Sequence, residues 1–180
     1  LDPRLLLGIG LALTAWAFYA MTGWTPNVSQ TTIVVVGLIQ GAGLGFLFVP
    51  LSAVSLATLS AEQRTDGSGI YNLSRNIGSS VGISVVNALL TTNTQVNHAD
   101  IATSVTAVNR AFEGPAISQF MSPVTAAGRA ALDQVVTQQA VIISYIDDYK
   151  LLLVATLAVV PLVFLFTKTT AASDRTMVLE

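Results

Sequence analysis

The chain has 180 residues, of which 52% are hydrophobic and only 10% are charged, and its formal net charge at pH 7 is −2. A typical soluble domain has about 25% charged residues, so this composition indicates a membrane protein. The absence of cysteine excludes disulfides and thiolate chemistry, and the slight negative charge gives a nucleic-acid partner no electrostatic support.

Four stretches are apolar enough to predict transmembrane helices, because a spanning helix needs about 20 mostly apolar residues. They cover about residues 5–23, 31–59, 67–90 and 149–167. The first and the last carry no charge in their interiors, whereas the third is interrupted by Asn72, Arg75 and Asn76. The sequence therefore predicts an all-α membrane protein with four spans.

The second predicted span combines a stripe of small residues with a proline. Gly37, Gly41 and Gly45 are spaced by four, which makes a flat surface where another helix can approach closely. This surface serves either plain helix packing or a sliding contact. Pro50 removes one backbone hydrogen bond and is a hinge candidate, although many such kinks are purely structural. Gln40 is a candidate for lining a cavity, with an ordinary interhelical hydrogen bond as the alternative.

The third predicted span has one small and polar face, because five residues recur at spacings of three and four: Ser68, Asn72, Arg75, Ser79 and Gly82. Gly78 and Gly82 form a second pair suited to helix packing. Such a face is expected to contact protein or a water-filled cavity rather than lipid. Arg75 is then either a structural residue that reaches the headgroup level or a charge in a transport cavity or gate, and Asn72 and Asn76 are candidates for the same site.

The stretch of about residues 91–148 is long and polar, and it predicts a partly helical external segment. Asp100 is a candidate N-cap for one amphipathic helix, which Gly114 and Pro115 would end. Ser122 and Pro123 are typical of the start of a second helix that continues into the last span. The apolar positions expected to share one face of that helix are Val124, Ala127, Ala131, Val135 and Ile142.

The remaining polar residues of this segment have plain interpretations. His98 is interpreted as a solvated surface residue, and Asp147 and Asp148 as interface-level charges paired with Lys150 rather than a proton site. Basic residues near the short connections predict cytoplasmic ends, with a cytoplasmic tail of about residues 168–180. The residues that carry this orientation are Arg4, Arg64, Lys168 and Arg175, and Lys150 argues against it.

The order of these features resembles a known family. The matching elements are Gln40-Gly41, Pro50, Arg64, Asn72-x-x-Arg75, Gly78-x-x-x-Gly82, Gln138-Gln139-Ala140 and Ile146-Asp147-Asp148. Together they resemble the C-terminal half of the 14-helix major facilitator drug:proton antiporters, the EmrB/QacA group. The resemblance implies that residues 1–180 are the last four helices of such a transporter, with the second span lining the cavity and the third contacting the other half.

The resemblance also implies a function. It is proton-driven multidrug efflux of hydrophobic or cationic compounds by alternating access, in the bacterial inner membrane, with a proton gradient and no cofactor or metal. The implied partners are the bilayer, the N-terminal helices of the same transporter, small-molecule drugs and, in some relatives, a periplasmic adaptor and an outer-membrane channel. No enzyme motif is present, so an enzyme is not expected. The alternatives are a facilitator transporter for sugars or metabolites and a stand-alone four-helix membrane scaffold.

Overall fold

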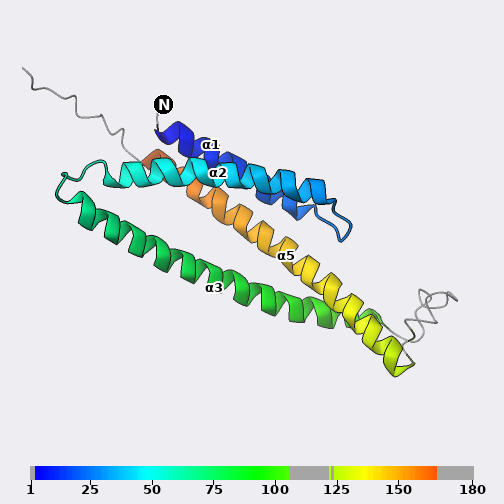
Figure 1. Ribbon diagram of the computed structural model, residues 1–180. Coiled ribbons are helices and arrows are strands. Elements are labelled where there is room, and N and C mark those ends of the chain that lie inside the picture. The colour runs from blue at the N-terminus through cyan, green and yellow to red at the C-terminus, as the bar shows by residue number, and fades with distance from the viewer. Residues whose placement is uncertain (1–2, 106–121, 123, 166–180) are drawn as a thin grey trace, which may run out of the picture.

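A computed structural model describes residues 3–105, 122 and 124–165 of the chain. In this part the chain forms four helices and no strand (Figure 1): α1 (Pro3–Thr22), α2 (Gln30–Leu56), α3 (Arg64–Ser104) and α5 (Ala126–Leu165). The predicted all-α class is therefore confirmed for the described residues. The predicted tail of residues 168–180 lies outside them, as do Gly114 and Pro115.

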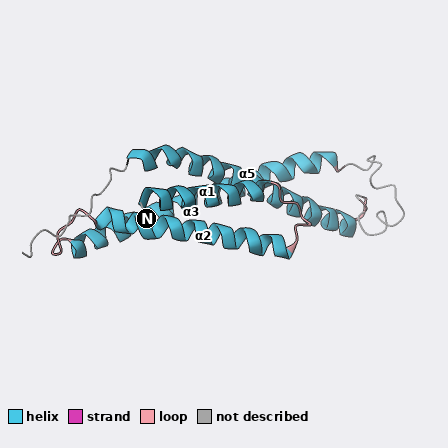
Figure 2. Ribbon diagram, turned by 90° about the horizontal axis from the view of Figure 1, so that it is seen from above, coloured by secondary structure: helices cyan, strands magenta, loops and turns pink. Residues whose placement is uncertain are grey.

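The helices form two antiparallel pairs, α1 with α2 and α3 with α5, and the two pairs are held together mainly where α1 meets α5. α1 packs against α2 and α5, while α3 packs mainly against α5 and contacts α2 only sparingly. Figure 1 shows α2 and α3 joined by a hairpin and then diverging, and Figure 2 shows the elongated bundle from above. The far end of α3 and the start of α5 extend together beyond the α1–α2 pair (Figure 1). The bundle therefore has a shared central region and a two-helix extension.

α1 and α2 approach closely because glycines lie at their crossing. A Cβ added at Gly10 would lie 2.8 Å from the carbonyl oxygen of Gly43, and one at Gly43 would lie 3.0 Å from the backbone nitrogen of Thr14. The Thr14 hydroxyl donates to the carbonyl oxygen of Gly10 at 2.8 Å, which satisfies it within the helix. Beyond the crossing, Ala17, Met21 and Val36 form a small buried cluster.

Local sequence signals explain where α2 begins and how it continues. Ser29 has extended backbone angles and its hydroxyl accepts from the backbone nitrogen of Thr32 at 3.1 Å, which is an N-cap. The helix then runs through Pro50 to Leu56. The proline is accepted because one missing backbone hydrogen bond does not end a helix that packing supports.

Within the part of the chain that the structure describes, two helices are long and apolar enough to cross a membrane, namely α1 and α2. The most apolar 18-residue window of α2 is only 11% buried within the described chain, so the helix presents most of its apolar surface outward. Val34, Leu38 and Val49 are among its exposed residues. This surface is suited to lipid or to further helices, whereas a core helix of a soluble protein is mostly buried.

The structure changes the predicted organisation of the external segment. Asp100 lies inside α3, which continues without interruption to Ser104, so the prediction that Asp100 caps a separate helix is wrong. α5 is one helix of 40 residues that begins at Ala126, three residues after Pro123. Asp100 fits inside α3 because polar residues in the middle of a helix are tolerated where a neighbouring helix provides packing. The prediction that the second helix continues into the last span agrees with α5, which runs without a break to Leu165.

The side of α5 that packs in the structure is not the apolar face predicted for the second amphipathic helix. The buried residues of α5 are instead Leu132, Val136, Ala140, Ser144 and Asp148, and Gly128 precedes them at the same spacing. Val124 is 75% exposed and Val135 is 37% exposed. The buried residues include a serine and an aspartate. A pattern of apolar residues alone therefore predicts a stripe that is displaced by about one position along the helix from the buried one.

Candidate functional site

The polar face of α3 is an exposed surface within the described chain. None of the residues of α3 is buried, and Asn72, Arg75 and Asn76 are all exposed. Several serines on this helix satisfy their hydroxyls locally, as when Ser79 donates to the carbonyl oxygen of Asn76 at 3.0 Å. The helix therefore presents a surface of small and polar residues, and several of its serine hydroxyls are already hydrogen-bonded within the helix.

Arg75 is the one predicted site residue that the structure joins to another helix. Its guanidinium carbon lies 4.3 Å from the centre of the Phe48 ring on α2, in a cation–π arrangement. The ring attracts the cation through its negative face, and the contact needs no carboxylate. Arg75 therefore lies against α2 near the hairpin end, where the two helices are still close (Figure 1).

The other polar candidates are not brought into contact with one another. Gln40 is partly buried on α2, while Asn72 and Asn76 are exposed on α3. Among the described residues, none of these three amides forms a side-chain hydrogen bond. Their role in a substrate cavity stays a prediction.

The predicted glycine stripe faces open space. A Cβ added at Gly37, Gly41 or Gly45 would meet nothing within 4 Å, and the same holds for Gly78 and Gly82. The close approach of α1 and α2 uses Gly43, which lies on a different face of α2. No described residue packs against the stripe. Its role in helix packing therefore stays a prediction.

Pro50 is buried on the side of α2 that faces α1. It lines an apolar hollow of about 450 Å³ whose other residues are Leu6, Ala42, Gly45, Phe46 and Val49. Space next to a proline permits a change of helix angle, but the structure records one conformation. The hinge role also stays a prediction.

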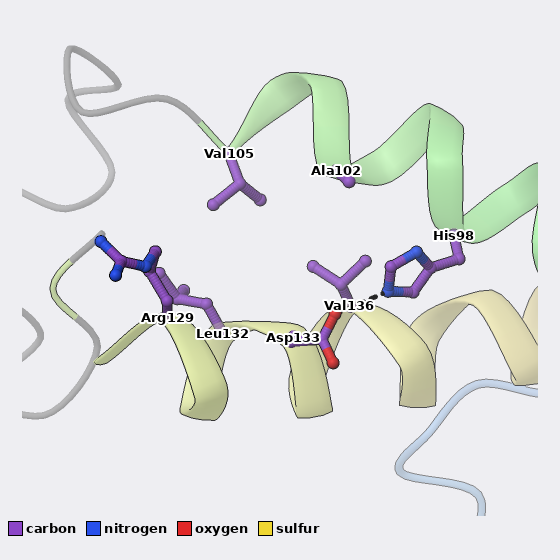
Figure 3. Close-up of a pocket in the computed structure, with 7 residues that line it drawn as sticks. All are labelled: His98, Ala102, Val105, Arg129, Leu132, Asp133 and Val136. Carbon is purple, nitrogen blue, oxygen red and sulfur yellow. Dashed lines mark hydrogen bonds and ion pairs between the residues drawn. The ribbon is translucent and has the colours of Figure 1, made fainter. Parts of the chain in front are cut away.

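A pocket with a mixed lining of apolar and charged side chains lies in the two-helix extension (Figure 3). It has a volume of about 230 Å³ and is lined by His98, Ala102 and Val105 of α3 and by Arg129, Leu132, Asp133 and Val136 of α5. His98 Nε2 lies 3.0 Å from Asp133 Oδ1. His98 is therefore a partly exposed surface residue, 34% exposed at its side chain, and the sequence did not predict its partner 35 positions away.

The contact between α3 and α5 contains a buried hydrogen bond. Asn97 Nδ2 donates to Ser144 Oγ at 3.0 Å, and Ser144 in turn donates to the carbonyl oxygen of Ala140 at 2.7 Å. Ser144 is fully buried, so these two bonds satisfy a hydroxyl that water does not reach. Asp148 lies one turn further along the same buried side of α5.

Asp148 is a buried carboxyl group. It is 3% exposed, and its Oδ2 atom is buried without a hydrogen-bond partner in the described chain. Burial, and secondarily the charge of Asp147, raise the pKa of Asp148 above its ordinary value of 3.8. Asp148 precedes the predicted span of about residues 149–167.

The two neighbouring aspartates have different roles. Lys150 Nζ donates to Asp147 Oδ1 at 2.9 Å, and both side chains are substantially exposed. The predicted pairing with Lys150 therefore applies to Asp147 and not to Asp148. The spacing of four residues from Leu132 to Asp148 is the sequence pattern that indicates a buried Asp148. A polar residue at the end of such a stripe is more typical of a helix surface, so the pattern alone does not predict its burial.

Aromatic residues surround the same turn of α5. The Tyr149 ring meets the Trp24 ring edge-on with centroids 5.9 Å apart, and the Tyr145 and Tyr149 rings stack at 6.3 Å. Trp24 and Tyr149 both pack on the cluster of Ala17, Met21 and Val36. This part of α5 therefore contacts α3 through Ser144, and it contacts Trp24, which follows the end of α1, through Tyr149.

Comparison with known proteins places these features among membrane transporters. The chain is 28% identical over 111 residues to the colistin resistance protein EmrB of Acinetobacter baumannii, covering 62% of this chain and 22% of that protein. It is 23% identical over 168 residues to the probable multidrug resistance protein EmrY of Escherichia coli, covering 91% of this chain and 32% of that protein. An uncharacterized MFS-type transporter of Bacillus subtilis, YhcA, is 29% identical over 100 residues, which cover 56% of this chain and 19% of that protein.

The class of protein that the chain resembles is thus the helical membrane transporters. More particularly, the chain is a relative of the major facilitator multidrug transporters of the EmrB type, and the resemblance predicted from the sequence is confirmed. The chain spans between about a fifth and a third of the length of these relatives. No family model matches the chain. No solved structure matches it either.

Proposed function

We propose that the chain is part of a proton-coupled multidrug efflux transporter that exports hydrophobic or cationic compounds by alternating access. The observation that carries the proposal is the similarity to proteins named for multidrug resistance, which for EmrY extends over 91% of this chain. The energy source is a proton gradient across the bacterial inner membrane, and no cofactor is needed.

The surface of the bundle supports this assignment. α2 is the most apolar helix and yet it is little buried, while α3 presents a polar face with Arg75. In the proposed transporter, N-terminal helices of the same protein cover part of this surface, and lipid covers the rest. Gln40, Asn72 and Asn76 then line or gate the cavity, and the glycines of α2 and α3 allow the two halves to approach closely.

The topology proposed for this part has four spans, with both ends in the cytoplasm. α1, α2, the first part of α3 and the last part of α5 cross the membrane, and the extension of α3 and α5 lies outside. The contacts on the two sides of Asp148, with α3 and with Trp24, support this division of α5. An external two-helix extension is also a suitable surface for a periplasmic adaptor that leads to an outer-membrane channel.

Resistance and transport assays on the full-length protein test the function. Drug-hypersensitive bacteria that express it should tolerate several hydrophobic cations better than control cells. Inverted membrane vesicles should accumulate a fluorescent cation when a proton gradient is imposed and should release it when the gradient is collapsed. If cells gain no resistance and vesicles accumulate no cation, drug export is the wrong function, and uptake of a sugar would favour a facilitator.

Arg75→Ala tests the proposed role of the polar face. We expect the substitution to abolish transport while the amount of folded protein in the membrane decreases much less. Arg75→Lys keeps the charge and should retain part of the activity, although lysine lacks the planar guanidinium. An equal loss of transport and of folded protein for Arg75→Ala would mean that Arg75 is structural.

A further inference from the structure

We propose that Asp148 is a proton-binding site at the junction of α5 with α3 and with Trp24. The proton is the ligand, and the carboxyl group is neutral and buried when it is bound. The inference concerns the chemistry of one side chain, and its connection to transport rests on the function proposed above.

The first observation is the position of Asp148 in the fold. It ends the buried side of α5 formed by Leu132, Val136, Ala140 and Ser144, and only 3% of it is exposed. Asn97 holds the preceding turn to α3, and Tyr149 holds the next residue against Trp24. The carboxyl group is therefore confined by contacts on both sides rather than located on a free helix surface.

The second observation is the lack of compensation for a negative charge. Oδ2 of Asp148 is buried and has no hydrogen-bond partner in the described chain. The closest cation on α5, Lys150, is already paired with Asp147. Because a buried carboxylate without a partner is strongly disfavoured, the neutral acid is the form that suits this environment.

The charged and titratable groups of the neighbouring helices do not change this conclusion. On α5 the groups near Asp148 are Tyr145, Asp147, Tyr149 and Lys150. α1 carries Arg4 and Tyr19. α3 carries Arg64, Asp66, Tyr71, Arg75, His98 and Asp100. Of these, Arg4 and Arg75 lie far along their helices from the Asn97 and Trp24 contacts, and His98 is paired with Asp133.

The chemical step is a simple protonation. A carboxylate oxygen of Asp148 takes one proton from a hydronium ion, the O–H bond forms, and a water molecule is released without any oxidation or reduction. When the proton leaves, the charge requires water or a hydrogen-bond donor, so the contacts of α5 with α3 and with Trp24 must loosen. Protonation thereby favours the packed junction and deprotonation favours an opened one.

This behaviour is useful to a transporter. Trp24 follows the end of α1, so Asp148 lies near one end of a predicted span, within reach of an aqueous face. A proton that binds there from the outer side changes how firmly the two-helix extension is held to the membrane part. Two packing states of one junction, biased by one proton, are sufficient for coupling.

Infrared difference spectroscopy of the full-length protein in lipid nanodiscs tests the site directly. Spectra recorded between acidic and neutral buffer should contain the carbonyl stretch of a protonated carboxyl group that titrates. Asp148→Asn should remove this band, whereas the neighbouring Asp147→Asn, which alters an exposed and paired carboxylate, should leave it. Asp148→Glu keeps the carboxyl group and should retain a shifted band if Asp148→Asn fails to fold.

The outcomes separate the site from the function. A band that persists unchanged in Asp148→Asn, or that disappears equally in Asp147→Asn, overturns the proposal. Loss of the band in Asp148→Asn alone supports it, even if the full-length protein exports no drug. Where vesicle transport is measurable, its dependence on external pH should weaken in Asp148→Asn and persist in Asp147→Asn.

Discussion

Gly10 and Gly43 face each other where α1 crosses α2, and a Cβ added at Gly10 would lie 2.8 Å from the carbonyl oxygen of Gly43. Backbone atoms of the facing helix lie within about 3 Å of a Cβ at either position, together with the side chains of Leu47 at Gly10 and of Thr14 at Gly43, and the backbone cannot move aside without separating the helices. It differs from the open surroundings of Gly41 and Gly45 on the same helix. This difference leads to the first prediction.

Gly43→Ala should destabilise the bundle, whereas Gly41→Ala should not. The added methyl group at position 43 meets the Thr14 backbone nitrogen at 3.0 Å and the Gly10 carbonyl oxygen at 3.1 Å, so the helices must separate. Overpacking of this kind costs about 1–3 kcal/mol. The thermal unfolding midpoint of the full-length protein in detergent measures the effect, and equal midpoints for the two variants would contradict it.

The stripe of Gly37, Gly41 and Gly45 should instead affect transport. Because these positions face open space in the described chain, Gly41→Leu should leave the α1–α2 contact and the folded yield nearly unchanged. If the stripe contacts another part of the transporter, the same variant should lower the rate of cation accumulation in vesicles several-fold. Unchanged transport would show that the stripe faces lipid.

Phe48 and Arg75 should be energetically coupled. A cation–π contact contributes about 0.5–2 kcal/mol, depending on how far it is desolvated. Phe48→Leu should therefore lower stability, Phe48→Trp should preserve it, and Phe48→Leu should have less effect when Arg75 is already glutamine. A double-mutant cycle on unfolding midpoints measures the coupling, and strictly additive effects of Phe48→Leu and Arg75→Gln would rule it out.

Ser144→Ala should destabilise the contact between α3 and α5. The substitution removes the 3.0 Å acceptor of the partly buried Asn97 amide, and a lost hydrogen bond of this kind costs about 0.5–1.5 kcal/mol. Ser84→Ala is a matched control, because the exposed Ser84 also donates to a carbonyl oxygen four residues earlier but has no partner on another helix. Hydrogen exchange at residues 93–104 should increase only in Ser144→Ala, and equal exchange in both variants would argue against the bond.

Sequence patterns predicted which segments of this chain are helical, because runs of apolar residues and polar faces have a characteristic spacing. They predicted the ends of helices less well, since Asp100 has the chemistry of a cap and yet lies within a continuous α3. The sequence does not predict which side chains of different helices contact each other. The pairs Asn97–Ser144 and His98–Asp133 are 47 and 35 positions apart, and spacing along one helix does not specify which face a neighbour covers.

For the same reason, the sequence predicts candidate site residues but not their partners. Arg75 was singled out because a charge in an apolar segment is unusual, but its aromatic partner Phe48 has no polar signal in the sequence. Asp148 was assigned to the surface because Lys150 follows it closely. The structure gives that lysine to Asp147 and buries Asp148 instead. A choice between two adjacent carboxylates depends on helix rotation, which only packing determines.

The stability of the bundle should depend on pH through Asp148. Burial, together with the charge of Asp147, raises the pKa of Asp148 in the folded protein above 3.8, so the folded state binds this proton more tightly than the unfolded state. The stabilisation is therefore fully present below about pH 3.8 and is lost as the pH rises through the raised value. Asp148→Asn should raise the unfolding midpoint at pH 7, because it removes a buried charge. At pH 4 the same variant should differ little from the unmodified protein, and Asp147→Asn should show no such rise at pH 7. Unfolding midpoints of the variants and of the unmodified protein, measured from pH 4 to pH 8, test this prediction. If the midpoint of Asp148→Asn differs from that of the unmodified protein by the same amount at every pH, Asp148 does not titrate in this range.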